Sequence, residues 1–250
     1  MAKKVIPLSD LPVFTKHTSF PENPDIFQKG AVILMDKPTD WSSFQLVKYV
    51  RNRIPPKKVG HAGTLDPLAT GLLILCSGRA TKSISQIQEL EKTYHAVIRF
   101  GYSTPSFDLA TEPDEHAEWK HIDRNKLEDV LKDQFTGVIS QVPPIYSAVK
   151  VKGTRLYKLA RKGVDVQPEP RSVTIHEIRV IRVDLPEIEL EIRCGKGTYI
   201  RSLAHDLGKA LDSRAVLAEL RRTATGTFSA ADAFLPEEFD TFMANHKNQS

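Results

Sequence analysis

The stretch RSVTIHEIRVIRVDLPEIELEIRC, residues 171–194, decides the fold class of this 250-residue chain. Polar and apolar side chains alternate over 171–183 and again over 187–194. Such alternation is typical of long strands with one buried face. We therefore predict a largely antiparallel sheet built around these two strands.

Helices are predicted on both sides of this pair in the sequence. Downstream, GTYIRSLAHDLGKAL (197–211) places its apolar residues on one helical stripe, and a last helix near 214–220 precedes a strand near 221–228. Upstream, we predict strands at 31–35, 72–76 and 93–102 and around PPIY (143–146), and helices after Ser42 or Ser43, at 80–91, 124–134 and 154–162. Because strands and helices alternate irregularly, the prediction is an α+β (mixed α/β) fold with a central sheet flanked by helices.

Composition is that of a globular protein, with 40% hydrophobic and 26% charged residues and a net charge of +4. No apolar run approaches the ~18 residues that span a bilayer, and the start has no secretory leader pattern, so we predict a cytoplasmic protein without a membrane contact. Cys76 and Cys194 lie far apart and outside any metal-binding spacing, which predicts no metal site. The sequence leaves a disulfide between them open, but in a reducing cytosol two buried free thiols are the favoured alternative.

The domain prediction has three parts. Residues 1–29 contain four prolines and little periodicity, and are predicted to be an irregular arm. Residues 30–235 form the main domain, and 236–250 are a short tail, too short for another domain.

The chemistry centres on Asp66, in VGHAGTLDPLATGLLIL (59–75). The chain contains no phosphate-binding loop, dinucleotide fingerprint, nucleophile elbow or zinc-protease motif, so no cofactor is predicted. A carboxylate can act as a nucleophile or a general base, and glycines around it allow a ligand to approach the backbone. His61 could stack or hydrogen-bond in the same pocket. The alternative is an ordinary turn aspartate.

Basic clusters indicate a nucleic-acid partner. They are RNRIPPKKVGH (51–61), KVKGTRLYKLARK (150–162), RCGKGTYIR (193–201) and the pair Arg221 and Arg222. Each alone would be typical of a solvated face, but several together, one of them leading into the Asp66 loop, favour an RNA or DNA groove. A single carboxylate there suggests chemistry on a nucleotide turned out of its stack.

At this point the motifs as a set resemble those of the TruB-type tRNA pseudouridine synthases. GHAGTLDPLATGLL (60–73) resembles the catalytic loop of that family. Further segments match in the family's order: LMDKPTDWSSF (34–44), KTYHAVIRFGYST (92–104), PPIYSAVKVKGTRLYKLARKG (143–163), CGKGTYIRSLAHDLG (194–208) and LRRTATGTF (220–228).

The resemblance implies a cofactor-free isomerase that converts uridine 55 in the T loop of tRNA to pseudouridine, with Asp66 as its essential aspartate. Whether Asp66 attacks ring carbon 6, attacks the sugar or abstracts a sugar proton stays open. The family's remaining site residues, matched to this sequence, are His61 in the space left by the flipped base, Tyr94 stacking on the uracil, Tyr199, Arg201 pairing with the carboxylate, and Leu220 lining the pocket. Asp108 matches a family aspartate of unassigned role.

The resemblance also bears on partners. The segment at about 143–170 corresponds to the family's RNA-gripping insertion. Because the chain ends soon after the LRRTATGTF strand, we expect no PUA domain, no guide RNA, and recognition of the tRNA T arm by the catalytic domain. A monomer is the default expectation, since the sequence does not indicate the oligomeric state. A second role as a tRNA folding aid is compatible with this reading. The alternatives are a non-catalytic RNA-binding protein on the same fold and a glycoside hydrolase, which would normally need two carboxylates.

Overall fold

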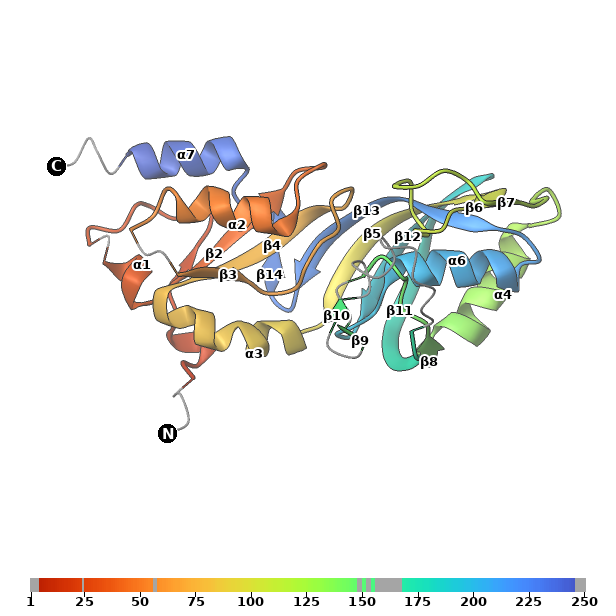
Figure 1. Cartoon of the computed structure of the whole chain (residues 1–250), viewed down its shortest axis with the longest axis horizontal. Helices are drawn as coiled ribbons and strands as arrows, with labels where there is room; N and C mark the ends of the chain where they lie inside the picture. Colours follow the sequence, from red (N-terminus) through yellow and green to blue (C-terminus); the bar gives the residue numbers. More distant parts are fainter. Residues whose placement is uncertain are drawn as a thin grey trace. The chain divides into compact units, whose positions relative to one another are not determined.

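The computed structural model describes residues 5–23, 25–55, 58–147, 150–151, 154–155 and 168–245. The chain divides into two compact units (Figure 1). Unit 1 comprises residues 1–92 and 221–250, and unit 2 comprises residues 93–220.

Unit 1 is organised around one strand, β4 (Thr70–Ser77). Along one edge it pairs antiparallel with β2 (Val32–Lys37), which also pairs in parallel with β1 (Val13–Phe14). Since β2 occupies one edge of β4 over residues 71–76, two further strands must share the other edge. These are β3 (Val59–His61), antiparallel opposite residues 75–77, and the end of β13 (Ala215–Thr225), parallel opposite Thr70 and Gly71; β14 (Phe228–Ser229) extends β13. The loop between β3 and β4 therefore leaves the sheet after His61 and re-enters it at Thr70, where β4 pairs with β13.

The middle of β2 and of β4 is buried on both faces of the sheet. Ile33 and Met35 of β2 face one hydrophobic cluster, whereas Val32 and Leu34 face another. A strand covered on both sides needs a continuous apolar run rather than alternation, which explains AVILM and LLILC in the sequence. The short strands predicted at 31–35 and 72–76 are confirmed.

Helices cover both faces of this sheet (Figure 1). On one face lie α2 (Ser43–Arg51) and α7 (Pro236–Ala244), which contribute Leu46, Val50 and Phe239 to the first cluster. On the other face, the 3₁₀ helix η2 (Gly78–Ser83) leads into α3 (Ile84–Glu89), whose Ile87 enters the second cluster. Ser42 caps α2 through a reciprocal pair of bonds with Gln45, as its sequence predicts.

Both ends of the chain are more structured than the sequence suggested. The predicted arm forms η1 (Leu8–Asp10), β1 and α1 (Ile26–Lys29), and its Phe14 and Phe27 are buried in the first cluster. The predicted tail forms α7, which begins at Pro236, a residue that fits the first turn of a helix because it needs no backbone donor there. In both segments, aromatic burial provides the order that local sequence did not reveal.

Unit 2 contains the antiparallel pair from which the prediction began. β11 (Arg171–Asp184) and β12 (Glu187–Cys194) pair from Ile175↔Cys194 to Asp184↔Glu187. β8 (Gly137–Gln141) flanks β11, and β5 (Lys92–Phe100) flanks β12, with the first part of β13 beside β5. Two short ribbons, β6 (Tyr102–Ser103) with β7 (Glu115–His116) and β9 (Lys150–Val151) with β10 (Thr154–Arg155), stand apart from this order.

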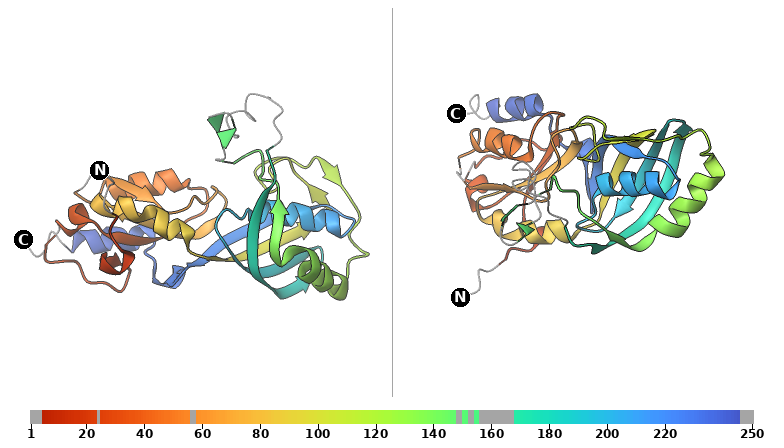
Figure 2. Two further views of the ribbon diagram at one scale, coloured as in Figure 1. Left: turned by 90° about the horizontal axis from the view of Figure 1, so that it is seen from below. Right: turned by 45° about the vertical axis from the view of Figure 1, so that its right-hand side comes forward.

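Two helices pack on one face of these strands, and Figure 2 shows α6 lying across them with α4 beside it. α4 (Arg124–Phe135) contacts β11 and α6 (Ile200–Ala210). Leu127, Leu131 and Phe135 of α4 are buried, as are Ile200, Leu203 and Leu207 of α6. The opposite face of the strands carries charge pairs, among them Arg99–Glu187 and Arg182–Glu189. The sheet thus has one apolar and one solvated face, as the alternation predicted.

The prediction of an α+β fold with a sheet flanked by helices is confirmed, and antiparallel pairs predominate among the described strands. Two predicted elements are wrong. Residues 214–220, predicted as a helix, lie mainly in strand β13, and Thr154–Arg155, predicted at the start of a helix, form β10. The rest of that predicted helix, 156–162, lies outside the described residues.

Candidate active site

Asp66 lies on the loop that joins β3 to β4 in unit 1. The backbone amide of Ala69 donates to the carbonyl of Asp66 at 3.1 Å, which closes a turn with Asp66 first and Pro67 second. Both residue types favour those positions. Leu65 and Ala69 are each 3% exposed, whereas Asp66 itself is half-buried. Two apolar anchors therefore hold the loop on either side of the half-buried Asp66.

The hydroxyl of Ser43 fixes the loop to the start of α2. It accepts from the amide of Leu65 and donates to the carbonyl of the same residue, both at 2.9 Å. Ser43 is 3% exposed, so both bonds are shielded from water. This contact sets the backbone immediately before Asp66.

Lys37, at the end of β2, fixes the loop from another side. Its ammonium donates to the carbonyls of Pro38 (2.7 Å), Trp41 (2.6 Å) and Pro67 (3.1 Å), which uses all three of its donors. The side chain is fully buried, and burial lowers the pKa of Lys37 to about 8; the carboxylates of Asp66, Asp40 and Asp36 oppose that shift. Lys37 therefore stays mainly charged at neutral pH and favours an ionised Asp66.

Arg222, on β13, supports the other end of the loop. Its guanidinium donates to the carbonyls of Leu72 (2.7 Å) and Gly63 (3.2 Å), and the residue is 2% exposed. Gly71 allows β13 to come this close: its φ is +96°, and a Cβ built there would lie 2.3 Å from the carbonyl oxygen of Arg222. We predicted that Arg221 and Arg222 belong to a phosphate-binding cluster. In the structure Arg221 pairs with Asp36 and Arg222 binds backbone carbonyls, and the binding of phosphate by this pair stays a prediction.

His61 precedes the loop on β3 and is half-buried. Burial, and to a smaller extent the charge of Arg222, lower the pKa of His61, so its imidazole is neutral at physiological pH. Its Nδ1 is buried and has no hydrogen-bond partner among the described residues. A neutral ring fits the space-filling role that the resemblance implied better than a charged one.

Replacing Lys37 with Met should destabilise unit 1. The apolar chain fits the buried path, but three backbone carbonyls lose their donor, and unmade buried hydrogen bonds are costly. We expect the free energy of unfolding to fall by about 2–4 kcal/mol, measured by urea denaturation. The exposed Lys58→Met variant is the control and should stay within about 0.5 kcal/mol of the wild type. Equal stability of Lys37→Met and wild type would contradict the role assigned to Lys37.

A second cluster, in unit 2, is built on Arg201 of α6. Its guanidinium donates to the carbonyls of Ser106 (3.0 Å) and Tyr146 (2.9 Å), and its Nε lies 3.7 Å from the carboxylate of Asp108. Arg201 is 4% and Asp108 8% exposed. The Ser106 hydroxyl (2.6 Å) and the Ala110 amide (3.0 Å) donate to the carboxylate of Asp108, which fixes its position beside Arg201.

Tyr199 and Tyr94 are positioned separately within unit 2. The side chain of Gln141 accepts from the amide of Tyr199 (2.7 Å) and donates to its carbonyl (2.9 Å), which locks the residue before α6. Tyr94 lies on β5 and is 9% exposed, and Leu220 lies on β13 and is half-buried. The structure therefore brings Arg201 together with Asp108, and Tyr199 lies two residues before Arg201, at the start of α6.

The loop that carries Asp108 is also tied to α6 by a ring stack. The rings of Phe107 and His205 lie 3.8 Å apart at 15°, and Phe107 has a positive φ of 63°. The amide of Leu217 donates to the carbonyl of Phe107 at 3.0 Å, which supports this strained backbone. Burial, aided by the charge of Lys209, lowers the pKa of His205 to about 4, so the stacked imidazole is neutral.

The depressed pKa of His205 predicts a pH effect on stability. Between pH 6.5 and about 4 the unfolded chain binds a proton at this residue and the folded chain does not, so the His205 contribution falls as the pH is lowered. The neighbouring Asp206, whose pKa burial raises to about 6, acts in the opposite direction over about pH 4–6. The His205→Phe variant should therefore gain stability relative to wild type as the pH falls from 7 to 4.5. Urea midpoints at both pH values test this, and a pH-independent difference would contradict it.

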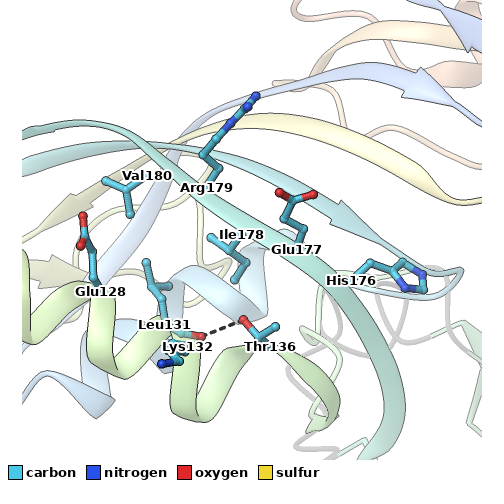
Figure 3. A pocket seen from close by; sticks show the side chains of 9 residues that line it. All are labelled: Glu128, Leu131, Lys132, Thr136, His176, Glu177, Ile178, Arg179 and Val180. Atoms are coloured by element: carbon cyan, nitrogen blue, oxygen red, sulfur yellow. Dashed lines mark hydrogen bonds between the residues drawn. The ribbon is translucent and has the colours of Figure 1, made fainter.

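A surface hollow in unit 2 lies apart from both residue clusters. The hollow, of about 520 Å³, lies between α4 and β11 (Figure 3). It is lined by Glu128, Leu131, Lys132, Thr136, His176, Glu177, Ile178, Arg179 and Val180, and none of the predicted site residues is among them.

Within the described part of the chain, no three His, Cys, Asp or Glu side chains are placed to hold a metal ion.

The sequence missed the residues that hold the Asp66 loop. Lys37, Ser43 and Arg222 all act on backbone groups of that loop or its flanks. The motifs LMDKPTDWSSF and LRRTATGTF contain these three residues and were the only sequence signal for them, but the motifs do not indicate what the residues contact.

None of the described helices has both the length and the apolarity that crossing a bilayer requires.

Comparison with solved structures defines the class to which the fold belongs. The chain superposes on a chain of the "Cbf5-Nop10-Gar1 Complex" with a TM-score of 0.69 and 25% identity, covering 98% of this chain and 63% of that one. It also superposes, with a TM-score of 0.65 and 22% identity, on a chain from the "H/ACA RNP bound to a substrate RNA containing 2'-deoxyuridine", over 94% of this chain and 64% of that one. The second likeness shows the fold alone.

Curated relatives and family models narrow the class. The tRNA pseudouridine synthase B of Parabacteroides distasonis is 47% identical over 223 residues, 87% of this chain and 94% of the relative. That of Flavobacterium johnsoniae is 48% identical over 217 residues, 84% and 94% of the two chains. Residues 51–200 match the TruB family pseudouridylate synthase N-terminal domain, and 201–250 match the tRNA pseudouridylate synthase B C-terminal domain. The chain belongs to the TruB family of pseudouridylate synthases and is an isomerase.

Proposed function

We propose that this protein converts uridine 55 in the T loop of tRNA to pseudouridine, with Asp66 as its catalytic carboxylate. In this isomerisation the bond between N1 of the uracil and C1′ of the ribose breaks, and a bond between C5 and C1′ forms. C5 loses its proton and N1 gains one, so no external atom or electron is needed. The proposal includes no cofactor and no metal.

The observation that carries the proposal is the way unit 1 holds Asp66. Ser43, Lys37 and Arg222 bind backbone groups of the loop or of its flanks. A catalytic group must be held within a fraction of an ångström of its working position by such supporting contacts. The positive charge of Lys37 also favours the ionised carboxylate, which either a nucleophile or a base requires.

The remaining predicted site residues are proposed to bind the substrate. Tyr94 and Tyr199 offer aromatic faces for a base that has left its stack, and Leu220 offers an apolar contact. Arg201 is buried and held beside Asp108, so the position of its charge is fixed. It is proposed to pair with the catalytic carboxylate or to contact the RNA. His61, neutral and partly buried, is proposed to fill the position of the flipped base.

Partner and location complete the proposal. The T arm of tRNA is the proposed substrate, bound without a guide RNA by a monomer in the cytoplasm. The predicted domains, an arm, a catalytic domain over 30–235 and a tail, remain part of it. Most of the proposed RNA-gripping insertion at 143–170 lies outside the described residues.

Incubation with an unmodified tRNA transcript, followed by mapping of pseudouridine, tests this function. We expect product at position 55 in the wild-type transcript, and none in a transcript with cytidine at that position. Product at another position would keep the chemistry and overturn the substrate assignment. Tight tRNA binding by wild type with no product in any transcript would favour the non-catalytic RNA-binding alternative.

A further inference from the structure

A stripe on the outer side of α2 is unusual for a surface helix. Phe44 is 64% exposed, Lys48 is exposed and Arg51 is half-exposed. These three residues are spaced by four and three positions, so they lie within about 60° of one another around a helix of 3.6 residues per turn. The opposite side of α2 is buried through Leu46, Val47 and Val50, which fixes the stripe outward.

The two cations of this stripe form no ion pair with any described residue. The helix itself, SFQLVKYVR, contains no acidic residue. Two other arginines of unit 1 are occupied, since Arg53 pairs with Asp240 and Arg221 with Asp36. The stripe therefore combines a solvent-facing aromatic ring with two available positive charges, which is the combination that binds single-stranded nucleic acid.

The stripe is linked rigidly to the Asp66 loop. Ser43, next to Phe44 in the chain, makes two 2.9 Å bonds to Leu65, which is next to Asp66. The bonds of Ser42 with Gln45 also fix the first turn of α2. An RNA strand whose nucleotide reaches Asp66 would pass close to the start of this helix.

We propose that Phe44, Lys48 and Arg51 form an RNA-binding stripe that holds the substrate strand beside the modified nucleotide. Phe44 stacks on an unpaired base, and Lys48 and Arg51 contact the phosphates. This inference rests on the proposed function for the identity of the RNA. Charge favours RNA over a protein partner, because an apolar protein contact would not require two available cations.

Binding of an unmodified tRNA to purified full-length variants tests the stripe. In the Lys48→Ser/Arg51→Ser double variant, two phosphate contacts are removed, so the slope of log affinity against log salt should become less steep by roughly 1–2. Phe44→Ser should raise the Kd roughly tenfold with little change in the salt slope, and Phe44→Tyr should restore it, because stacking is tolerant of the ring. The single-turnover rate at saturating tRNA should stay within about threefold of wild type.

Matched controls change the same kinds of residue elsewhere in unit 1. Lys16→Ser/Lys29→Ser removes two exposed charges, and Leu235→Ser removes an apolar side chain that is 41% exposed. If the stripe variants bind tRNA with the wild-type Kd and salt slope, or no differently from these controls, the RNA stripe is refuted. A loss of binding in an enzyme that forms no pseudouridine would support the stripe while refuting the proposed function, so the two failures are distinguishable.

Discussion

Asp66→Asn will reduce pseudouridine formation by at least about 10⁴-fold, the largest effect we expect from a single substitution. The amide is the same size as the carboxylate and keeps the turn, but it can neither attack as a nucleophile nor accept a proton at neutral pH. The measurement is the single-turnover rate on unmodified tRNA, with product mapped at position 55. The Kd for tRNA should change by less than about tenfold, because the side chain contributes to the chemical step and little to tRNA affinity.

Asp40→Asn provides the matched control for this experiment. Asp40 is exposed, and its charge, like that of Asp66, favours the charged form of Lys37. We expect its single-turnover rate to stay within a few-fold of wild type. Comparable rates for Asp66→Asn and Asp40→Asn would show that Asp66 is a turn residue and would end the assignment. Urea denaturation of both variants shows whether either effect comes from unfolding.

Arg201→Lys will lower the single-turnover rate by roughly 10²–10³-fold. The guanidinium donates to two separate carbonyls, those of Ser106 and Tyr146, while it faces Asp108; a single ammonium cannot reproduce that planar arrangement. Because the residue is buried, the melting temperature should fall as well. The rate at saturating tRNA therefore has to be measured well below that temperature.

The exposed Arg193→Lys variant, in the same unit, is the control for Arg201. It should retain wild-type rate and stability. If Arg201→Lys lowers the melting temperature but keeps the wild-type rate at saturation, Arg201 is a structural residue only. A rate loss with an unchanged Kd for tRNA places its role in the chemical step or in positioning for it.

The elements that could be predicted are those whose polar and apolar periodicity is visible within a single segment of the sequence. The long alternating strands and the amphipathic helix at 197–211 bury one face each, and both patterns are visible in single segments. Residues 214–220 show the opposite case. RAVLAEL is rich in good helix formers, yet it forms β13, because the strand is paired within the sheet and pairing outweighs weak local preference.

The candidate site divides in a similar way. Asp66 and its turn could be read from the chain, because Asp and Pro favour those positions locally. The contacts of Lys37 and Arg222 could not, since each reaches a carbonyl 30 or more residues away, and its partner depends on the register of β2 and β13 against β4. The burial of Phe14 and Phe239 was likewise hidden, because it requires both chain ends to pack on one sheet.

Gly71 limits how this enzyme could be redesigned. Any side chain at this position would push β13 away from β4 and take the guanidinium of Arg222 from the loop it supports. Thr64, in contrast, is exposed on the same loop. Libraries that aim to change which RNA is modified should therefore diversify position 64 and leave glycine at position 71.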